Sequence, residues 1–243
     1  MFSDYFLEKQ DELQKALQDR LQAQGLTAPD KKRDVAVFGD FYTFLREHLP
    51  REYSIATGKV RNKKHLLNRN CDVLIYNKWC ERYLDLTGGY VLADSMHAFL
   101  SLEAHLSPAA LKTHANMSRA LKSLYASERG LDDTEIIPVY SVLFAWQSTD
   151  SLISLASMLK EICAQKEIPL NQQTDMLVVL GNGIVIRDYE AGGSYRCIET
   201  GKDTLMWFYI LFLEYIDREG RFQLDLRDYI KQNSEYKEDT VTA

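Results

Sequence analysis

The chain lacks any run of apolar residues that approaches the roughly 20 needed to span a bilayer. Its first residues, Met-Phe-Ser-Asp-Tyr-Phe-Leu-Glu-Lys, also lack the basic start and the apolar stretch of a secretory signal. These two absences predict a protein that neither crosses a membrane nor enters the secretory pathway. We therefore expect a soluble, cytoplasmic protein without a membrane partner.

Cysteine is scarce, with four residues in the chain, and no two of them form a Cys-x-x-Cys pair. Such a pair is the usual signature of a structural zinc site, so its absence argues against zinc. His97 and His114 offer no alternative, because neither has a partner at a recognisable ligand spacing. Scattered cysteines in an intracellular chain are usually reduced and structural.

An excess of positive charge is also missing, since 29 Lys and Arg against 35 Asp and Glu give a net charge of −6. A protein that coats nucleic acid without specificity is usually basic, so this chain does not fit that class. A nuclease stays open, because a carboxylate-rich metal site itself adds negative charge. One local cluster is cationic: Lys59, Arg61, Lys63, Lys64, His65 and Arg69.

What the chain does contain is an alternation of helical and strand patterns. Apolar residues at helical spacing predict helices at 4–24, 37–48, 108–125, 150–165 and 203–217. Apolar runs rich in β-formers predict strands at 53–60, 71–76, 98–104, 139–146, 175–180 and 184–186. Ser107 is expected to cap the helix that opens with Pro108. Gly181-Asn182-Gly183 is expected to form a hairpin turn.

This order of elements predicts an α/β fold in which helices sandwich a mixed β-sheet. Hydrophobic residues make up 46% of the 243 positions, which is enough to bury a full core. We divide the chain into an N-terminal helix and linker at 1–36, one α/β domain at 37–232 and a polar tail at 233–243. We expect the tail to be disordered.

Two acidic residues stand at the ends of strand patterns, Asp72 at the start of one and Glu103 near the end of another. If these strands are neighbours, both carboxylates can face one point. Paired carboxylates are what a hard cation such as Mg²⁺ requires. Taken alone, the positions equally fit solvated or capping acids, so the spacing leaves both interpretations open.

Four segments give the pair a context: GDFYTFLREHLP at 39–50, YSIATGKV at 53–60, CDVLIY at 71–76 and LEAHLS at 102–107. In this order they resemble the pattern G-E…L-R…L-P, G-x-V, D-[IV]-[IL]-[IV]-Y and I-E-V-K-[ST]. That pattern belongs to a bacterial domain-of-unknown-function family with the restriction-endonuclease-like fold, within the PD-(D/E)XK nuclease superfamily. The resemblance covers about residues 37 to 125.

The resemblance implies roles for individual residues. It makes Asp72 and Glu103 ligands of Mg²⁺ or Mn²⁺, to which we add the main-chain carbonyl of Ala104. Asp40 stands where the family has a Glu on the first core helix. His105 stands where the family has its catalytic Lys, and a protonated histidine can supply part of the same charge. Lys112, on the following helix, is the alternative cation; a solvated helix residue is its simpler interpretation.

Two functions follow from the resemblance. The first is a metal-dependent nuclease that hydrolyses DNA or RNA in bacterial anti-phage defence. The alternative is a catalytically degenerate nuclease fold that binds nucleic acid or a protein partner without cleavage. The alternative is favoured by the acidic net charge and by two differences from the family pattern, His105 in place of Lys and Asp40 in place of Glu. The enzyme is favoured because Asp72 and Glu103 match the acidic residues of the pattern. The amphipathic helix at 4–24 also suits a third interpretation, a scaffold subunit that forms a homodimer.

Overall fold

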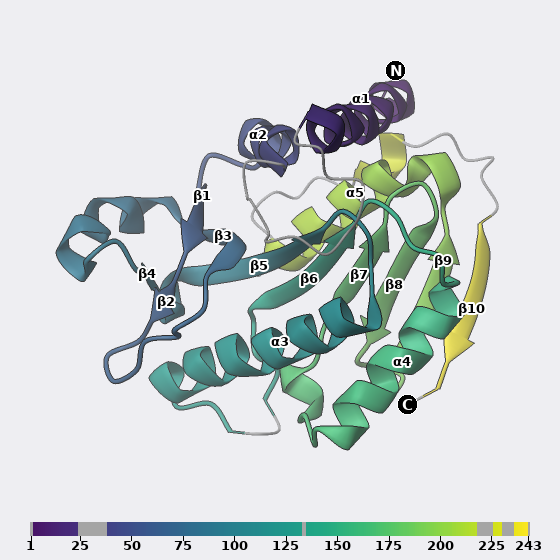
Figure 1. Cartoon of the computed structure of the whole chain (residues 1–243). Helices are drawn as coiled ribbons and strands as arrows, with labels where there is room; N and C mark the ends of the chain where they lie inside the picture. Colours follow the sequence, from purple (N-terminus) through teal and green to yellow (C-terminus); the bar gives the residue numbers. More distant parts are fainter. Residues whose placement is uncertain (1, 24–37, 133–134, 218–225, 230–235, 243) are drawn as a thin grey trace.

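The computed structural model describes residues 2–23, 38–132, 135–217, 226–229 and 236–242 (Figure 1). The helices are α1 Phe2–Ala23, α2 Gly39–His48, α3 Pro108–Arg129, α4 Leu152–Gln165 and α5 Thr204–Ile216. The strands are β1 Tyr53–Gly58, β2 Val60–Arg61, β3 Cys71–Asn77, β4 Val91–Leu92, β5 Met96–Glu103, β6 Tyr140–Ala145, β7 Met176–Val179, β8 Gly183–Asp188, β9 Ser194–Glu199 and β10 Lys237–Val241. Short 3₁₀ turns connect several of these elements.

Eight strands form one mixed sheet in the order β1-β3-β5-β6-β7-β8-β9-β10. The central strands β5, β6 and β7 are parallel, and every other pairing in this sheet is antiparallel. Helix α3 joins β5 to β6, and α4 joins β6 to β7. Because crossover connections are right-handed, two steps in one direction place both helices on one face. Figure 1 shows α3 and α4 on that face, with α1, α2 and α5 on the other.

Helices cover both faces of the sheet, so the central strands are apolar on both sides. On β6, Phe144 packs with Phe41 of α2 and Phe208 of α5. Its neighbour Leu143 belongs to the opposite cluster, with Leu155 of α4. These side chains are at most 1% exposed. The predicted α/β sandwich is therefore confirmed.

The predicted elements match the observed ones closely in the centre of the chain. The strands expected at 71–76, 98–104 and 139–146 appear as β3, β5 and β6, and all five helices are present. The strand expected at 53–60 differs, since β1 ends at Gly58 and Val60 pairs instead with Val91 in a separate two-stranded sheet. Of the 1–36 segment, residues 24–36 lie outside the described part of the chain.

Disorder was expected throughout the polar tail, and for residues 237–241 that expectation is wrong. They form β10, which pairs antiparallel with β9 from Lys237 opposite Glu199 to Val241 opposite Tyr195. Strand β9 was also not expected. Both strands complete the far edge of the sheet.

Two local signals in the sequence are confirmed at atomic detail. The Ser107 hydroxyl accepts a hydrogen bond from the Ala110 amide at 3.2 Å, which caps α3 as predicted. Gly181 adopts φ +80° in the turn between β7 and β8, a conformation that favours glycine. A Cβ on Gly183 would lie 2.2 Å from the Ile198 carbonyl oxygen, so this position requires glycine for space. No helix among the described residues is both long and apolar enough to cross a membrane.

Candidate functional site

Asp72 and Glu103 lie on adjacent strands. In the antiparallel pairing of β3 with β5, Val73 stands opposite Leu100. Continuing this register by one residue places Asp72 opposite Ser101, on the same face of the sheet as Glu103. The Cα atoms of diagonal neighbours of this kind are roughly 7–8 Å apart. The structure therefore brings the two predicted acids together at one end of the sheet.

The Asp72 carboxylate reaches across to β5 and is held there. Its Oδ2 accepts a hydrogen bond from the Leu102 main-chain amide at 2.9 Å, and the residue is only 8% exposed. The side chain thus takes the place of a main-chain acceptor where the β3–β5 ladder has ended. This contact orients Asp72 toward the residue that precedes Glu103.

Cys71 precedes Asp72 in the sequence, and its thiol is a poor candidate for a metal ligand. Burial, and secondarily the charge of Asp72, raise the pKa of the Cys71 thiol to about 12. The thiol therefore stays protonated near neutral pH, whereas a metal ligand must be a thiolate. This site consequently presents oxygen ligands, which suit Mg²⁺ or Mn²⁺ and not zinc.

A buried histidine on α3 contacts the strand that carries Glu103. His114 of α3 is fully buried, and its Nδ1 lies 2.8 Å from the Ser101 hydroxyl. Ser101 is the residue between Leu100 and Leu102 on β5, so this contact ties α3 to the strand that carries Glu103. The sequence alone indicated no role for His114; the signal that could have found it is a polar residue within the apolar face of a helix.

Ala104 and His105 follow directly after β5. The Ala104 side chain packs on the layer formed by α1, α2 and α5. His105 is partly buried and makes no hydrogen bond or ion pair within the described residues. It lies two residues beyond Glu103 in the sequence.

The structure does not bring Asp40 or Lys112 to the acid pair. Asp40 lies on α2, which covers the opposite face of the sheet, and its carboxylate forms an ion pair with Arg20 of α1 at 2.8 Å. Lys112 is exposed on α3, whereas its neighbours Leu111 and His114 turn toward the sheet. Lys112 thus faces solvent.

Two carboxylates and a neighbouring carbonyl are a ligand set that a hard cation accepts. Within the described ranges, no group of three or more His, Cys, Asp and Glu side chains is arranged to hold a metal ion. Mg²⁺ commonly takes only one or two protein carboxylates and completes its shell with water and substrate phosphate. The two carboxylates of Asp72 and Glu103 are therefore compatible with Mg²⁺ in number and kind.

A second cluster of charge lies buried at the opposite end of the parallel strands. Lys122 of α3 is fully buried, and its Nζ lies 2.7 Å from Asp175 Oδ2. The same oxygen accepts hydrogen bonds from the Ser141 amide at 2.7 Å and hydroxyl at 2.8 Å. Burial lowers the pKa of Lys122, and the attraction of Asp175 opposes that shift. This ion pair joins α3 to β6 and to the start of β7.

Arg187 extends this buried cluster to β8. It is 4% exposed, and it donates to the carbonyls of Thr174 at 3.2 Å and Gly193 at 2.8 Å. Its guanidinium also lies 4.2 Å from the centre of the Tyr195 ring. Sequence reasoning did not identify this cluster, because its members are far apart in the sequence and match no recognised motif. Its complete burial points to a structural role.

Comparison with known proteins finds a shared fold only. No protein-family model and no curated sequence matches the chain. The solved structures of P. aeruginosa ATCC27853 NucC in its cAAA-bound form superpose with a TM-score of 0.67 and 14% identity, covering 90% of this chain and 92% of that chain. For E. coli MS115-1 NucC, the cAAA-bound form gives a TM-score of 0.64, 15% identity and coverage of 90% and 91%. The apo form of the same protein gives a TM-score of 0.63 and 16% identity, covering 90% of this chain and 93% of that chain.

Proposed function

We propose that this protein is a divalent-metal-dependent nuclease that hydrolyses phosphodiester bonds of DNA or RNA in anti-phage defence. The observation that carries the proposal is the placement of Asp72 and Glu103 on adjacent strands, at one end of a sheet of this fold. The likeness to the NucC structures supports a nuclease in anti-phage defence.

In this proposal Asp72, Glu103 and the main-chain carbonyl of Ala104 hold Mg²⁺ or Mn²⁺. The bound cation supplies positive charge beside the phosphate and lowers the pKa of a water molecule. The hydrogen bond from the Leu102 amide keeps Asp72 in place before substrate arrives. A protonated His105 donates an N–H to a phosphate oxygen, which is the role of the lysine in the family that the sequence resembles.

The alternative, a nuclease fold that binds without cleaving, is favoured by two observations. Asp40 is committed to an ion pair with Arg20 and lies across the sheet from the acids. His105 stands where the family that the sequence resembles has a lysine, which would be charged at all physiological pH values. Both departures remove groups on which a related nuclease would rely.

Cleavage assays decide between the two. Plasmid DNA, linear duplex DNA, single-stranded DNA and RNA are incubated with the protein in Mg²⁺, in Mn²⁺ or in EDTA. Each mixture is tested with and without cAAA, because two of the similar structures contain it. Cleavage in metal but not in EDTA supports the nuclease. Binding without cleavage in every mixture favours the degenerate fold.

Variants of His105 test its role as the cation. We expect His105→Lys to preserve or raise cleavage, because lysine keeps its charge, and His105→Ala to lower it by about 10²-fold or more. A His105→Ala protein as fast as wild type would leave His105 a structural residue.

A further inference from the structure

The segment Lys59–Asn70, which we call the basic hairpin, has a charge opposite to that of the chain. Its sequence KVRNKKHLLNRN contains five Lys and Arg and no Asp or Glu. Since the whole chain carries −6 and this segment +5, the remaining residues carry −11. A positive patch on a negative protein concentrates attraction for an anion at one place.

Hydrogen bonds within the segment fix the conformation of the basic hairpin. The Asn62 amide donates to the His65 carbonyl, and the Leu67 amide donates to the Val60 carbonyl, each at 2.9 Å. Asn62 is 4% exposed, and its Oδ1 accepts hydrogen bonds from the amides of Lys64 at 2.9 Å and His65 at 2.7 Å. The buried asparagine therefore fixes the turn that displays these two residues.

The same asparagine attaches the basic hairpin to α3. Its Nδ2 donates to the Leu124 carbonyl at 3.2 Å and to the Ser127 hydroxyl at 2.9 Å. Helix α3 also carries His114, which supports the strand of Glu103. The hairpin and the strand of Glu103 thus both contact α3, at points about 15–20 Å apart along the helix.

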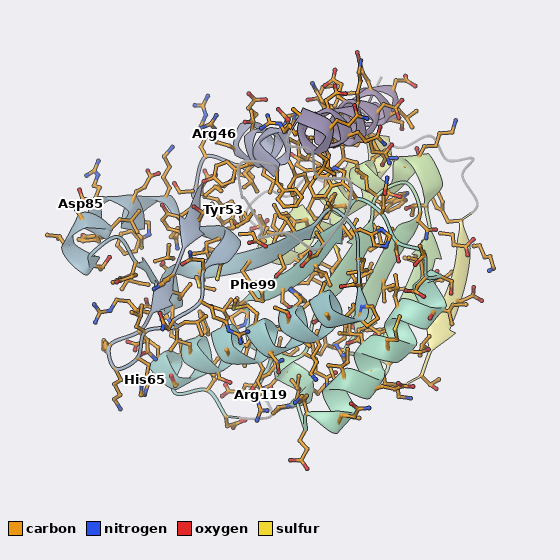
Figure 2. All side chains as sticks on the ribbon, in the orientation of Figure 1. Arg46, Tyr53, His65, Asp85, Phe99 and Arg119 are labelled. Carbon is orange, nitrogen blue, oxygen red and sulfur yellow. The ribbon has the colours of Figure 1, made fainter. Side chains whose placement is uncertain are left out.

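Most of the cationic side chains in the basic hairpin face solvent. Lys63 is 84% exposed even though it pairs with Glu128 at 2.8 Å. Lys64 and Arg69 are exposed, and Arg61 is partly buried; none of these three forms an ion pair with another described residue. Figure 2 shows His65 at the outer rim of the molecule. Three cations are therefore available to a partner.

The basic hairpin leads directly into the candidate site. Arg69 precedes Asp72 by three residues, so their Cα atoms are at most about 11 Å apart. A ligand held by Arg69 would therefore be close enough to reach Asp72. The tip of the hairpin, with Lys64, lies eight residues before Asp72 in the sequence and can contact the same ligand at a second place.

We propose that the basic hairpin binds the phosphate backbone of a nucleic-acid duplex and holds it across the Asp72–Glu103 pair. This inference rests on the proposed function for the identity of the site. Residues 59–70 contain no Phe, Tyr or Trp, so they lack the large stacking platforms typical of proteins that bind single strands. Their lysines, arginines and asparagines are the donors that contact phosphate and sugar without regard to sequence.

The experiment measures binding apart from cleavage. Anisotropy of a labelled DNA duplex is recorded in EDTA over a range of salt concentrations. The test variant combines Arg61→Ala, Lys64→Ala and Arg69→Ala; the matched control combines Lys15→Ala, Lys166→Ala and Lys202→Ala, three exposed lysines elsewhere. We expect the test variant to bind the duplex at least about tenfold more weakly than wild type. The slope of log binding constant against log salt concentration should decrease in magnitude by about 3, one for each cation removed. The control should match wild type, and equal melting temperatures establish folding.

Several outcomes separate this inference from the proposed function. Unchanged affinity and salt slope in the test variant would show that the basic hairpin is only a solvated loop, even if the protein cleaves. Loss of duplex binding in a protein that never cleaves would sustain the inference while refuting the nuclease. The same measurement is made with an RNA duplex and with a single strand. If the test variant lost affinity for the single strand alone, the assignment to a duplex would be overturned.

Discussion

Replacing Asp72 with asparagine is expected to slow cleavage by about three orders of magnitude while leaving the fold intact. Asparagine retains an oxygen that can accept the Leu102 amide hydrogen bond, so the substitution removes only the negative charge. Without that charge the site loses half of its carboxylate ligands for a hard cation. Single-turnover cleavage and Mn²⁺ calorimetry measure the two effects.

The matched control is Asp85→Asn, which removes one charge from an exposed residue labelled in Figure 2. It should cleave and bind Mn²⁺ as wild type does. Asp72→Ala is a less useful variant, because it also leaves the Leu102 amide without its acceptor, at a cost of about 1–3 kcal/mol. Equal Mn²⁺ affinity in wild type and Asp72→Asn would exclude a metal site at Asp72.

Replacing Asp175 with asparagine should destabilise the protein by about 3–5 kcal/mol. The substitution leaves the buried ammonium of Lys122 without its counter-ion and weakens the acceptor for Ser141. Adding Lys122→Met should recover much of the loss, because the cluster then contains no unpaired charge. Denaturant unfolding of the two single variants and the double variant measures the coupling.

The pH dependence gives an independent check on this buried pair. Burial lowers the pKa of Lys122 below 10.5 in the folded protein, so the unfolded chain binds more protons and stability rises with pH up to about 10.5. Loss of Asp175 removes the attraction that opposes this shift. The stability gap between Asp175→Asn and wild type should therefore narrow as the pH rises toward 10.5.

A surface pair supplies the control for these measurements. Arg196 and Glu238 lie 2.6 Å apart across β9 and β10, with both side chains more than 40% exposed. Glu238→Gln should cost less than about 1 kcal/mol, because solvent already screens the pair. A comparably small cost for Asp175→Asn would mean that Lys122 needs no counter-ion.

The central strands were predictable because their residues are apolar on both faces, which is uncommon outside a covered sheet. Strand β10 was not predictable, since KEDTV contains a single apolar residue. Its conformation comes from pairing with β9 and from contacts such as Arg196 with Glu238, which are remote in sequence. Strand β9 did carry a period-two signal, with Tyr195 and Cys197 buried and Arg196 exposed, but it is short.

The candidate site was predictable to a similar extent. Asp72 and Glu103 stand at strand ends, where an ordered motif can be recognised in sequence. Lys122 and Asp175 gave no such signal, because 52 residues separate them and a lysine on a helix usually indicates the solvated face. The ion pair between Lys122 and Asp175, the residue before β7, reveals that Lys122 faces inward.

Strand β10 also determines how the sheet meets other molecules. A bare edge at β9 would present unpaired main-chain amides and carbonyls on which a strand from another chain could add. Strand β10 occupies that edge with Lys237, Glu238 and Asp239, whose charges make it a poor template for further addition. The charged strand β10 thus protects this edge of the sheet against the addition of a strand from another molecule.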